Sequence, residues 1–258
     1  MRLEPASRFD IPFLADVFAR GYENYVVPFH MDAATLADVV RRWDIDLDRS
    51  RVAFDDDEPV GLANLALRGD RGWIGGIGVV PEARRHGIGR ILLEAVLAEA
   101  PGDVTLEVIE QNEAARRLYE QVGFVARERM LEVWTLTAQV ATVEARSVEP
   151  RPLGQEGLPW QREDASLPDA IERIEVDGGA AVFRVVNGTV GIGQLAARDE
   201  DAARDLLCAL RARGDRVSYV NVPEGDPASA ALRSLGGSLD LRQFEMTWLN
   251  PRSSAPTG

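Results

Sequence analysis

An arginine-rich loop with two glycines is the strongest sign of chemistry in this sequence. It runs from Val79 to Arg90 and reads VVPEARRHGIGR, between an apolar segment and an amphipathic one. Gly87 and Gly89 allow a tight turn and leave backbone N–H groups available at the start of the next helix, where the helix dipole favours negative charge. Together with the arginines, these amides predict a cradle for a pyrophosphate. A plain strand-to-helix surface turn is the alternative.

This loop matches neither of two common nucleotide-binding motifs. Its glycines lack the GxGxxG spacing, and no acidic residue ends a second parallel strand about 20 positions further on, as dinucleotide sites require. The sequence contains no Lys, so the loop is not a P-loop either.

A second stretch, from Leu106 to Phe124, places polar side chains on an expected strand and helix. Glu107 lies on the strand, Asn112 begins the helix, and Tyr119 lies within the helix.

These two stretches resemble the cofactor motifs of the GNAT N-acetyltransferases. The first has the spacing Arg84-x-x-Gly87-x-Gly89, which the family usually shows as Q/R-x-x-G-x-G/A. The resemblance covers residues 1–137 and, more weakly, 171–250. It implies a duplicated α+β (mixed α/β) fold, the acyl-CoA N-acyltransferase (GNAT) fold, with a central mixed β-sheet whose central strands splay apart between flanking helices. It also implies acetyl-CoA as co-substrate, lying in the splay, and no metal.

Carried over by position, the resemblance implies a set of cofactor contacts. Backbone groups of Ile77 and Val79 would contact the acyl and pantetheine arm, and Arg84 stands at the first position of the motif. Asn112 would contact the cofactor from the next helix. The pyrophosphate would be bound by Arg85, His86, Gly87, Ile88, Gly89 and Arg90.

The resemblance also assigns the acid and leaves the base open. Tyr119 stands where family members place the acid that protonates the CoA thiolate. The ordinary pKa of a tyrosine hydroxyl, near 10, suits donation to a thiolate that leaves a thioester, and an amphipathic core tyrosine is the alternative. Glu107 stands where the family's ribosomal-protein N-terminal acetyltransferases carry their base, and the alternatives are a polar strand residue and a water chain. The acceptor must attack as a free amine. At pH 7 this costs about 4–5 kcal/mol for a lysine amine and about 1 kcal/mol for an α-amine.

Three further features could bear on the acceptor. The aromatic stretch from Tyr22 to Phe29 corresponds to the segment with which the family shapes its acceptor pocket, and His30 follows it. A structural histidine is the simpler interpretation of His30. The acidic residues between 44 and 58 could steer a cationic acceptor, or they could be solvated loop residues.

The second half of the chain repeats the order of the first. Residues 104–136 align without a gap to residues 217–249, which predicts an internal duplication. The coinciding pairs are Val104/Val217, Ala115/Ala228, Gly123/Gly236, Arg129/Arg242, Glu132/Glu245 and Leu136/Leu249.

The second half has lost the residues that carry the chemistry. Its counterpart of the glycine loop reads RDEDAA from Arg198, with three acids and no glycine. Acidic side chains at a helix start satisfy the dipole and repel a pyrophosphate. Asn112 and Tyr119 align with Gly225 and Leu232. We therefore expect one active site, in the first half, and a degenerate second half.

Hydrophobic periodicity predicts the elements that position these residues. Ser7 is an expected N-cap, and residues 145–166 read as a Pro- and Gly-rich linker. We expect domains at 1–137 (active), 138–170 (linker and start of the second domain) and 171–250 (degenerate), with a tail at 251–258. Expected helices are 10–21, 32–43, 88–100, 112–122, 201–212 and 228–235; expected strands are 2–5, 51–54, 60–67, 73–80, 105–109, 130–136, 180–186, 189–197, 217–222 and 244–249.

Composition narrows the class of protein. The net charge of −13 argues against nucleic acid as a partner. No apolar run is long enough to span a bilayer, and the N-terminus lacks a secretory signal. Cys208 is the single cysteine, which excludes an internal disulfide and a cysteine zinc site. We expect a cytoplasmic protein without a membrane partner.

The leading interpretation is an acetyl-CoA-dependent N-acetyltransferase. Its partner would be a small-molecule or peptide amine. The protein would be a monomer or weak homodimer, because a fused duplication lessens the need for a homodimer. A catalytically idle acyl-CoA sensor or partner-binding module is the alternative. It would keep the arginine loop and make no use of Tyr119.

Overall fold

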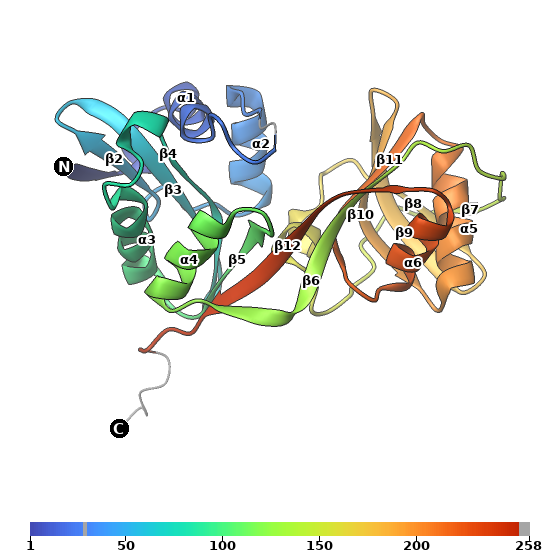
Figure 1. Cartoon of the computed structure of the whole chain (residues 1–258). Helices are drawn as coiled ribbons and strands as arrows, with labels where there is room; N and C mark the ends of the chain where they lie inside the picture. The colour runs from blue at the N-terminus through green and yellow to red at the C-terminus, as the bar shows by residue number, and fades with distance from the viewer. Residues whose placement is uncertain (28–29, 253–258) are drawn as a thin grey trace. The chain divides into compact units, whose positions relative to one another are not determined.

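The hydrophobic periodicity of the first half forms the expected alternation of strands and helices (Figure 1). In this computed structural model, residues 1–27 and 30–252 are described. Pro28 and Phe29, from the predicted acceptor stretch, and most of the expected tail lie outside them. The elements are β1 (Arg2–Pro5), α1 (Ile11–Gly21), α2 (Ala33–Arg42), β2 (Arg51–Asp55), β3 (Glu58–Arg68), β4 (Arg71–Val79), α3 (Ile88–Glu99), β5 (Val104–Ile109), α4 (Glu113–Val122) and β6 (Val125–Leu136).

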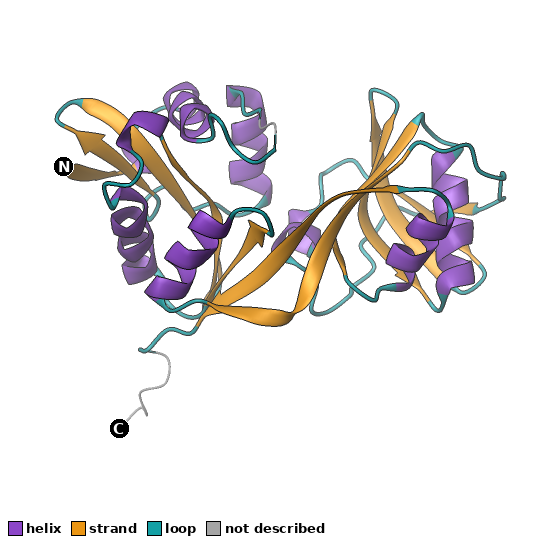
Figure 2. Cartoon of the chain, viewed as in Figure 1, coloured by secondary structure: helices purple, strands orange, loops and turns teal. Residues whose placement is uncertain are grey.

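The second half follows with fewer helices within the described residues (Figure 2). Its elements are β7 (Arg146–Val148), β8 (Glu172–Val176), β9 (Gly179–Val186), β10 (Thr189–Ala197), α5 (Glu200–Arg211), β11 (Arg216–Pro223), α6 (Pro227–Ser234) and β12 (Ser238–Trp248).

The chain forms two units, and the first of them is built from two separate segments of the sequence. The first unit is Met1–Arg127 with Glu245–Gly258, and the second is Glu128–Phe244. The strand order is β1-β2-β3-β4-β5-β12-β6 in the first unit and β12-β6-β11-β10-β9-β8-β7 in the second. Thus β12, from the end of the chain, lies beside β5, and β6 lies beside β11. Each unit receives a strand from the other half of the sequence.

This exchange explains why the expected strands at 130–136 and 244–249 were too short. Both strands begin earlier, at Val125 and Ser238. Their first residues are exposed, so they lack the alternation of buried and polar residues by which a strand is recognised.

The predicted duplication is confirmed by the elements. β5, α4 and β6 have β11, α6 and β12 as counterparts in the same order. Gly123 and Gly236 both follow the helix in the left-handed conformation, with φ of 103° and 77°. Each copy also buries a carboxylate at the same position. Glu245 pairs with Arg127 at 3.2 Å, and Glu132 lies 3.8 Å from Arg233 and 3.9 Å from Arg242.

Helices cover both faces of the sheet in the first unit. Leu62 of β3 packs in a core with Leu14 and Phe18 of α1, whereas a side chain at the preceding Gly61 would meet Leu92 of α3. Because successive strand residues face opposite sides, α1 and α3 lie on opposite faces. The N-cap of α1 is Asp10, whose carboxylate accepts from Phe13 N–H at 2.9 Å. Ser7, the predicted cap, instead lies in a short 3₁₀ turn.

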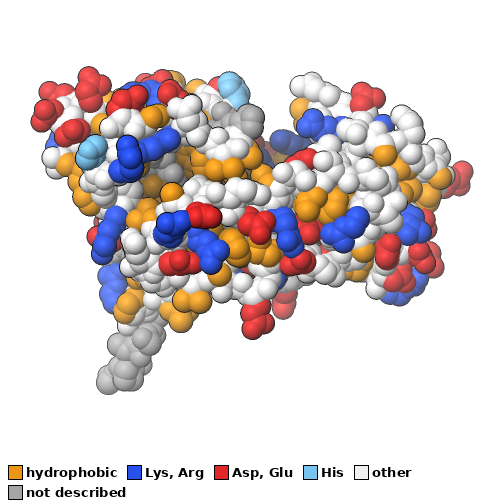
Figure 3. Space-filling view, viewed as in Figure 1, with side chains coloured by type: hydrophobic (Ala, Val, Ile, Leu, Met, Phe, Trp, Pro, Cys, Tyr) orange, Lys and Arg blue, Asp and Glu red, His pale blue; other side chains and the backbone are white. Residues whose placement is uncertain are grey.

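The expected linker is more ordered than its composition indicates. It contains β7 and two 3₁₀ turns, Trp160–Arg162 and Asp164–Ser166. Trp160, Arg162 and Ser166 are buried in the second unit. Acidic and basic side chains are interspersed over the face shown in Figure 3. No helix within the described residues is long and apolar enough to cross a membrane.

Candidate active site

A splay between β4 and β5 opens in the first unit. The two strands are parallel, and their register joins Gly72 to Val104 and Trp73 to Thr105. Beyond these pairs β4 continues to Val79 and β5 to Ile109. A β-bulge at Gly75 shifts the register of β4 against β3 just after Trp73. Bulges bend a strand and increase its twist, which accounts for the separation at this point.

The glycine loop forms an open helix N-terminus at the end of β4. Gly87 is the N-cap of α3 with φ of 80°, and the cap has no side-chain hydrogen bond. A Cβ on Gly87 would have open space, so glycine is needed here for its left-handed backbone. Glycine is needed at position 89 for a different reason: an added Cβ would lie only 3.3 Å from the Leu118 side chain of α4. The first turn of α3 therefore has the features of an anion site.

The arginines and histidine of this loop differ in their surroundings. Arg84 donates to three backbone carbonyls, of Val79 at 2.9 Å, Gly21 at 3.2 Å and Glu23 at 2.6 Å. It thereby ties the end of α1 to the end of β4. Arg90 pairs with Glu94 at 2.7 Å. Arg85 and His86 are exposed, and Arg85 has a left-handed backbone with φ of 66°.

The predicted acid and base come from the two elements that follow the loop. Tyr119 lies on α4, is 9% exposed and packs against Phe124 with ring centroids 5.9 Å apart. Burial, and then the neighbouring Tyr25, raise the pKa of Tyr119, so that its hydroxyl stays protonated. Glu107 lies on β5 and accepts a 2.8 Å hydrogen bond from Nε1 of Trp73.

Asn112 connects this region to the segment after α1. Its Oδ1 accepts from Ala115 N–H at 3.2 Å as the N-cap of α4, and its Nδ2 lies 3.5 Å from the hydroxyl of Tyr25. The Tyr25 ring meets that of Tyr22 edge-on at 4.8 Å. Burial raises the pKa of both tyrosines. Sequence reasoning had placed them in an aromatic stretch without separate roles, because nothing local indicates which side chain turns toward β4.

The same region of the second unit is closed. There the bulge on β10 falls at Gly193, and the parallel register with β11 runs from Thr189 to Ile192. Tyr219 of β11 accepts a hydrogen bond from backbone Leu195 of β10. Arg162 donates to the Tyr219 hydroxyl and, at 2.9 Å, to the carbonyl of Asn221. The Tyr219 side chain thus reaches from β11 to the backbone of β10, and Arg162 is buried beside it.

The helix N-terminus of the second unit is also closed. Asp199 is the N-cap of α5, and its carboxylate accepts from Ala202 N–H at 2.9 Å. Glu200 and Asp201 add two acids in the first turn. The side chains thus take the place that an anion would occupy at α3.

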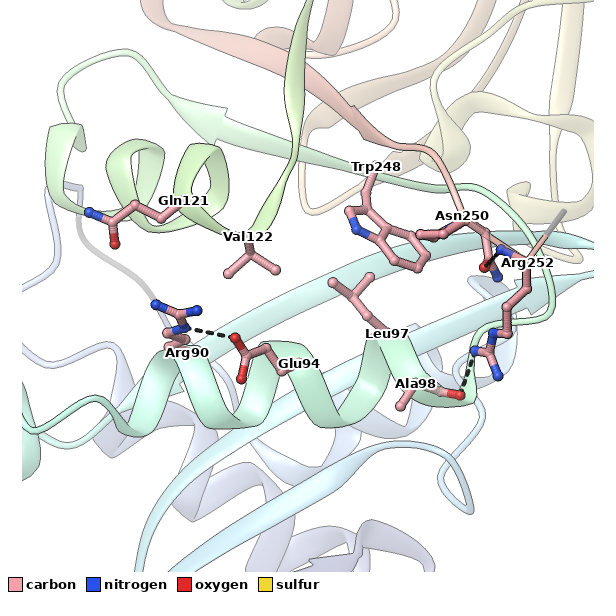
Figure 4. Close-up of a pocket in the computed structure, with 10 residues that line it drawn as sticks. Arg90, Glu94, Leu97, Ala98, Gln121, Val122, Trp248, Asn250 and Arg252 are labelled. Atoms are coloured by element: carbon pink, nitrogen blue, oxygen red, sulfur yellow. Dashed lines mark hydrogen bonds and ion pairs between the residues drawn. The ribbon is translucent and has the colours of Figure 1, made fainter. Parts of the chain in front are cut away.

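A separate groove in the first unit is lined by α3, the end of α4 and residues 248–252. Figure 4 shows Leu97, Val122 and Trp248 pointing into it from three elements. Arg252 closes one end by donating to the carbonyl of Ala98 at 2.8 Å. Among the predicted site residues, Arg90 lines this groove. Within the described residues, no group of three or more His, Cys, Asp or Glu side chains could hold a metal ion.

Comparison with known proteins agrees with this geometry. Residues 16–124 match the model of the Acetyltransferase (GNAT) family. The first unit carries a GNAT domain. Its glycine loop, its splay and Tyr119 all lie within the matched residues.

Two solved structures share the fold across both units. A GCN5-related N-acetyltransferase from Sphaerobacter thermophilus has a TM-score of 0.69 at 17% identity, covering 96% of this chain and 95% of that chain. A tandem GNAT protein from the clavulanic acid biosynthesis pathway has a TM-score of 0.66 at 16% identity and covers 100% of both chains. The duplicated GNAT fold is therefore confirmed.

A curated relative is similar over a shorter range. Mycothiol acetyltransferase of Clavibacter sepedonicus is 35% identical over 161 residues, which is 61% of this chain and 50% of that protein. The chain thus spans about half the length of this relative.

Proposed function

We propose that the first unit transfers an acetyl group from acetyl-CoA to a primary amine, by direct attack in a ternary complex. The observation that carries the proposal is the uncapped, glycine-bearing N-terminus of α3 at the end of a splayed β4. An exposed helix N-terminus suits a pyrophosphate, and the splay offers backbone groups to the arm that follows.

The residues of the loop and of β4 would hold the co-substrate. Backbone N–H groups at the start of α3, with Arg85 and His86 beside them, would bind the pyrophosphate, and Ile77 and Val79 would contact the acyl and pantetheine arm. The bonds of Arg84 to three carbonyls favour a role for its side chain in shaping this loop. Arg90 would reach a phosphate by leaving its exposed pair with Glu94, which costs little at an exposed site.

The chemical step would use Tyr119 and Glu107. Backbone N–H of Val79 would polarise the thioester carbonyl, while Glu107, directly or through water, takes the proton of the attacking amine. Tyr119 would donate its proton to the departing CoA sulfur. Because its pKa is raised, the Tyr119 hydroxyl carries its proton at neutral pH and has one to donate.

The second unit would not bind acetyl-CoA. Tyr219 reaches from β11 to the backbone of β10 with Arg162 beside it, and Asp199 caps its helix. A single co-substrate site per chain follows.

Calorimetric titration with acetyl-CoA tests the proposal. We expect one site per chain, and we expect binding to be lost when Arg85→Ala and Gly87→Ala are combined. The matched control is Arg198→Ala, at the corresponding loop of the second unit, which should leave binding unchanged. Two sites per chain would refute the closed second unit, and no binding would refute the proposed function. If acetyl-CoA binds but no amine is ever acetylated, the acyl-CoA sensor is the better interpretation.

A further inference from the structure

Two tyrosines that follow α1 join the two sides of the splay. The Tyr22 hydroxyl accepts a hydrogen bond from the backbone of Ile77 on β4. The Tyr25 hydroxyl lies 3.5 Å from Nδ2 of Asn112, at the start of α4. The two tyrosine rings meet edge-on, with their centroids 4.8 Å apart. Tyr22 and Tyr25 therefore form a continuous connection from β4 to α4, which we call the tyrosine bridge.

Tyr22 is the fixed half of the tyrosine bridge. Arg84 donates to the carbonyls of the residues on both sides of it, Gly21 at 3.2 Å and Glu23 at 2.6 Å. A Cβ added at Gly21 would lie 2.8 Å from the backbone of Gly78, so the end of α1 lies directly against β4. The backbone around Tyr22 is thus held against the strand to which its hydroxyl is bonded.

Tyr25 is the half that can move. It lies beyond the carbonyls that Arg84 holds and follows Asn24, whose φ of 56° is left-handed and uncommon for a residue other than glycine. The Tyr25 side chain is partly exposed, and 3.5 Å is long for a hydrogen bond. Burial raises the pKa of Tyr25, and the bond from Asn112 lowers it. Breaking this one bond would release Tyr25 while Tyr22 stays in place.

The tyrosine bridge spans the space that the arm of acetyl-CoA would need. Ile77 and Asn112 are both among the residues expected to contact the co-substrate, and an arm that contacts both has to lie between them. The bridge also adjoins the proposed acid, because the pKa of Tyr119 is raised by burial and then by Tyr25. This step rests on the proposed function.

We propose that Tyr25 is a gate for the co-substrate. It closes the splay through its bond to Asn112, and it moves away about Asn24 when the arm of acetyl-CoA enters. Opening breaks one hydrogen bond and one ring contact, and it leaves the bonds of Arg84 intact. Because the co-substrate binds only the fraction of molecules whose gate is open, weakening the closed form should raise the apparent affinity.

Calorimetric titration with acetyl-CoA and with CoA tests the gate. Tyr25→Phe keeps the ring and removes the hydroxyl to which Asn112 is bonded. We expect this variant to bind both molecules about two- to tenfold more tightly than the wild type, the range that corresponds to one neutral hydrogen bond. The matched control is Tyr219→Phe, which removes a tyrosine hydroxyl that meets a strand backbone in the second unit. It should change neither affinity.

Hydrogen exchange of the wild type gives a second readout. The backbone N–H of Tyr25 donates to the carbonyl of Tyr22 at 3.1 Å. If the gate opens, this bond is lost, so exchange in a peptide that covers Tyr25 should become faster when acetyl-CoA binds. Exchange at the start of α3 should become slower in the same experiment, because the pyrophosphate would cover it.

The outcomes separate the gate from the proposed function. An affinity that is unchanged or lower in folded Tyr25→Phe would overturn the gate, and so would exchange at Tyr25 that does not accelerate. Neither result would affect the co-substrate site itself, whose binding would still depend on Arg85 and Gly87. If circular dichroism shows that Tyr25→Phe does not fold, Tyr25→Leu takes its place with the same expectation. A wild type that binds neither acetyl-CoA nor CoA would instead overturn the proposed function.

Discussion

The indole Nε1 of Trp73 donates a 2.8 Å hydrogen bond to Oε2 of Glu107. Trp73 occupies the second of the two pairs that join β4 to β5, just before the strands separate. The ring of Trp43 meets it edge-on at 5.5 Å. The bond therefore orients the Glu107 carboxylate at the opening of the splay, where the proposed reaction needs a base.

Replacing this carboxylate tests its role. Glu107→Gln keeps an oxygen for Trp73 but removes the base, so kcat should fall by about 10²–10⁴-fold while the Kd for acetyl-CoA stays the same. Steady-state kinetics with an acceptor found by screening, together with calorimetry, measure both quantities. Glu110→Gln, at an exposed position close by, is the matched control. Full turnover in Glu107→Gln would point to the water chain as the base.

Tyr119→Phe should separate catalysis from binding. The change removes one hydroxyl from a buried ring, so the fold and the affinity for acetyl-CoA should be retained. Loss of the acid should lower kcat by about 10²-fold or more. Turnover equal to that of the wild type would exclude Tyr119 as the acid.

The four tyrosines of the chain should titrate abnormally. They are Tyr22, Tyr25, Tyr119 and Tyr219, and burial raises the pKa of each, that of Tyr219 to about 12. Unfolded tyrosines ionise near pH 10, so above that pH the unfolded chain loses protons that the folded chain keeps. The free energy of unfolding should therefore be unaffected by these groups below about pH 10 and fall as the pH rises above it.

Tyrosinate absorbance and urea unfolding at several pH values check this expectation. Tyrosines that ionise near pH 10 in the folded protein would contradict it, because their ionisation would show that burial does not protect them.

Gly87→Ala should cost stability through its backbone alone. The φ of 80° places a non-glycine residue in the left-handed region, at a cost of about 1–2 kcal/mol. Nothing within 4 Å would meet the added methyl group. Gly87→Asn should lose less, because asparagine tolerates this region better. Urea unfolding measures the difference, and equal stability of the alanine and asparagine variants would argue against backbone strain.

Asp199→Ala should destabilise the second unit without affecting co-substrate binding. The change removes the side-chain cap of α5, which accepts from Ala202 N–H at 2.9 Å, and loss of such a cap costs about 1 kcal/mol. Thermal unfolding reports the loss, and calorimetry should still find one acetyl-CoA site per chain. The appearance of a second site would show that Asp199 alone keeps the second unit closed.

Features that depend on neighbouring residues were predictable from the sequence. The boundaries of α1, α3 and α4 agree with the expected helices to within one residue, because their apolar residues recur with the helical period. The glycine loop before α3 is a single local turn, so its two glycines predict its backbone conformation without knowledge of the rest of the fold. The acids after Arg198 likewise revealed the capped helix of the second unit.

Contacts between distant segments were decided by the tertiary structure. The exchange of β6 and β12 depends on which strand edge each one meets, and the pattern of a strand does not specify its partner. The position of Tyr22 on β4 depends on the path of the chain after α1, and the closure of the second unit depends on Arg162, which lies in a segment that reads as a linker. The sequence by itself therefore determined the family motifs and the elements that carry them. The tertiary structure decided how far each splay is open, because that depends on side chains brought together from distant parts of the chain.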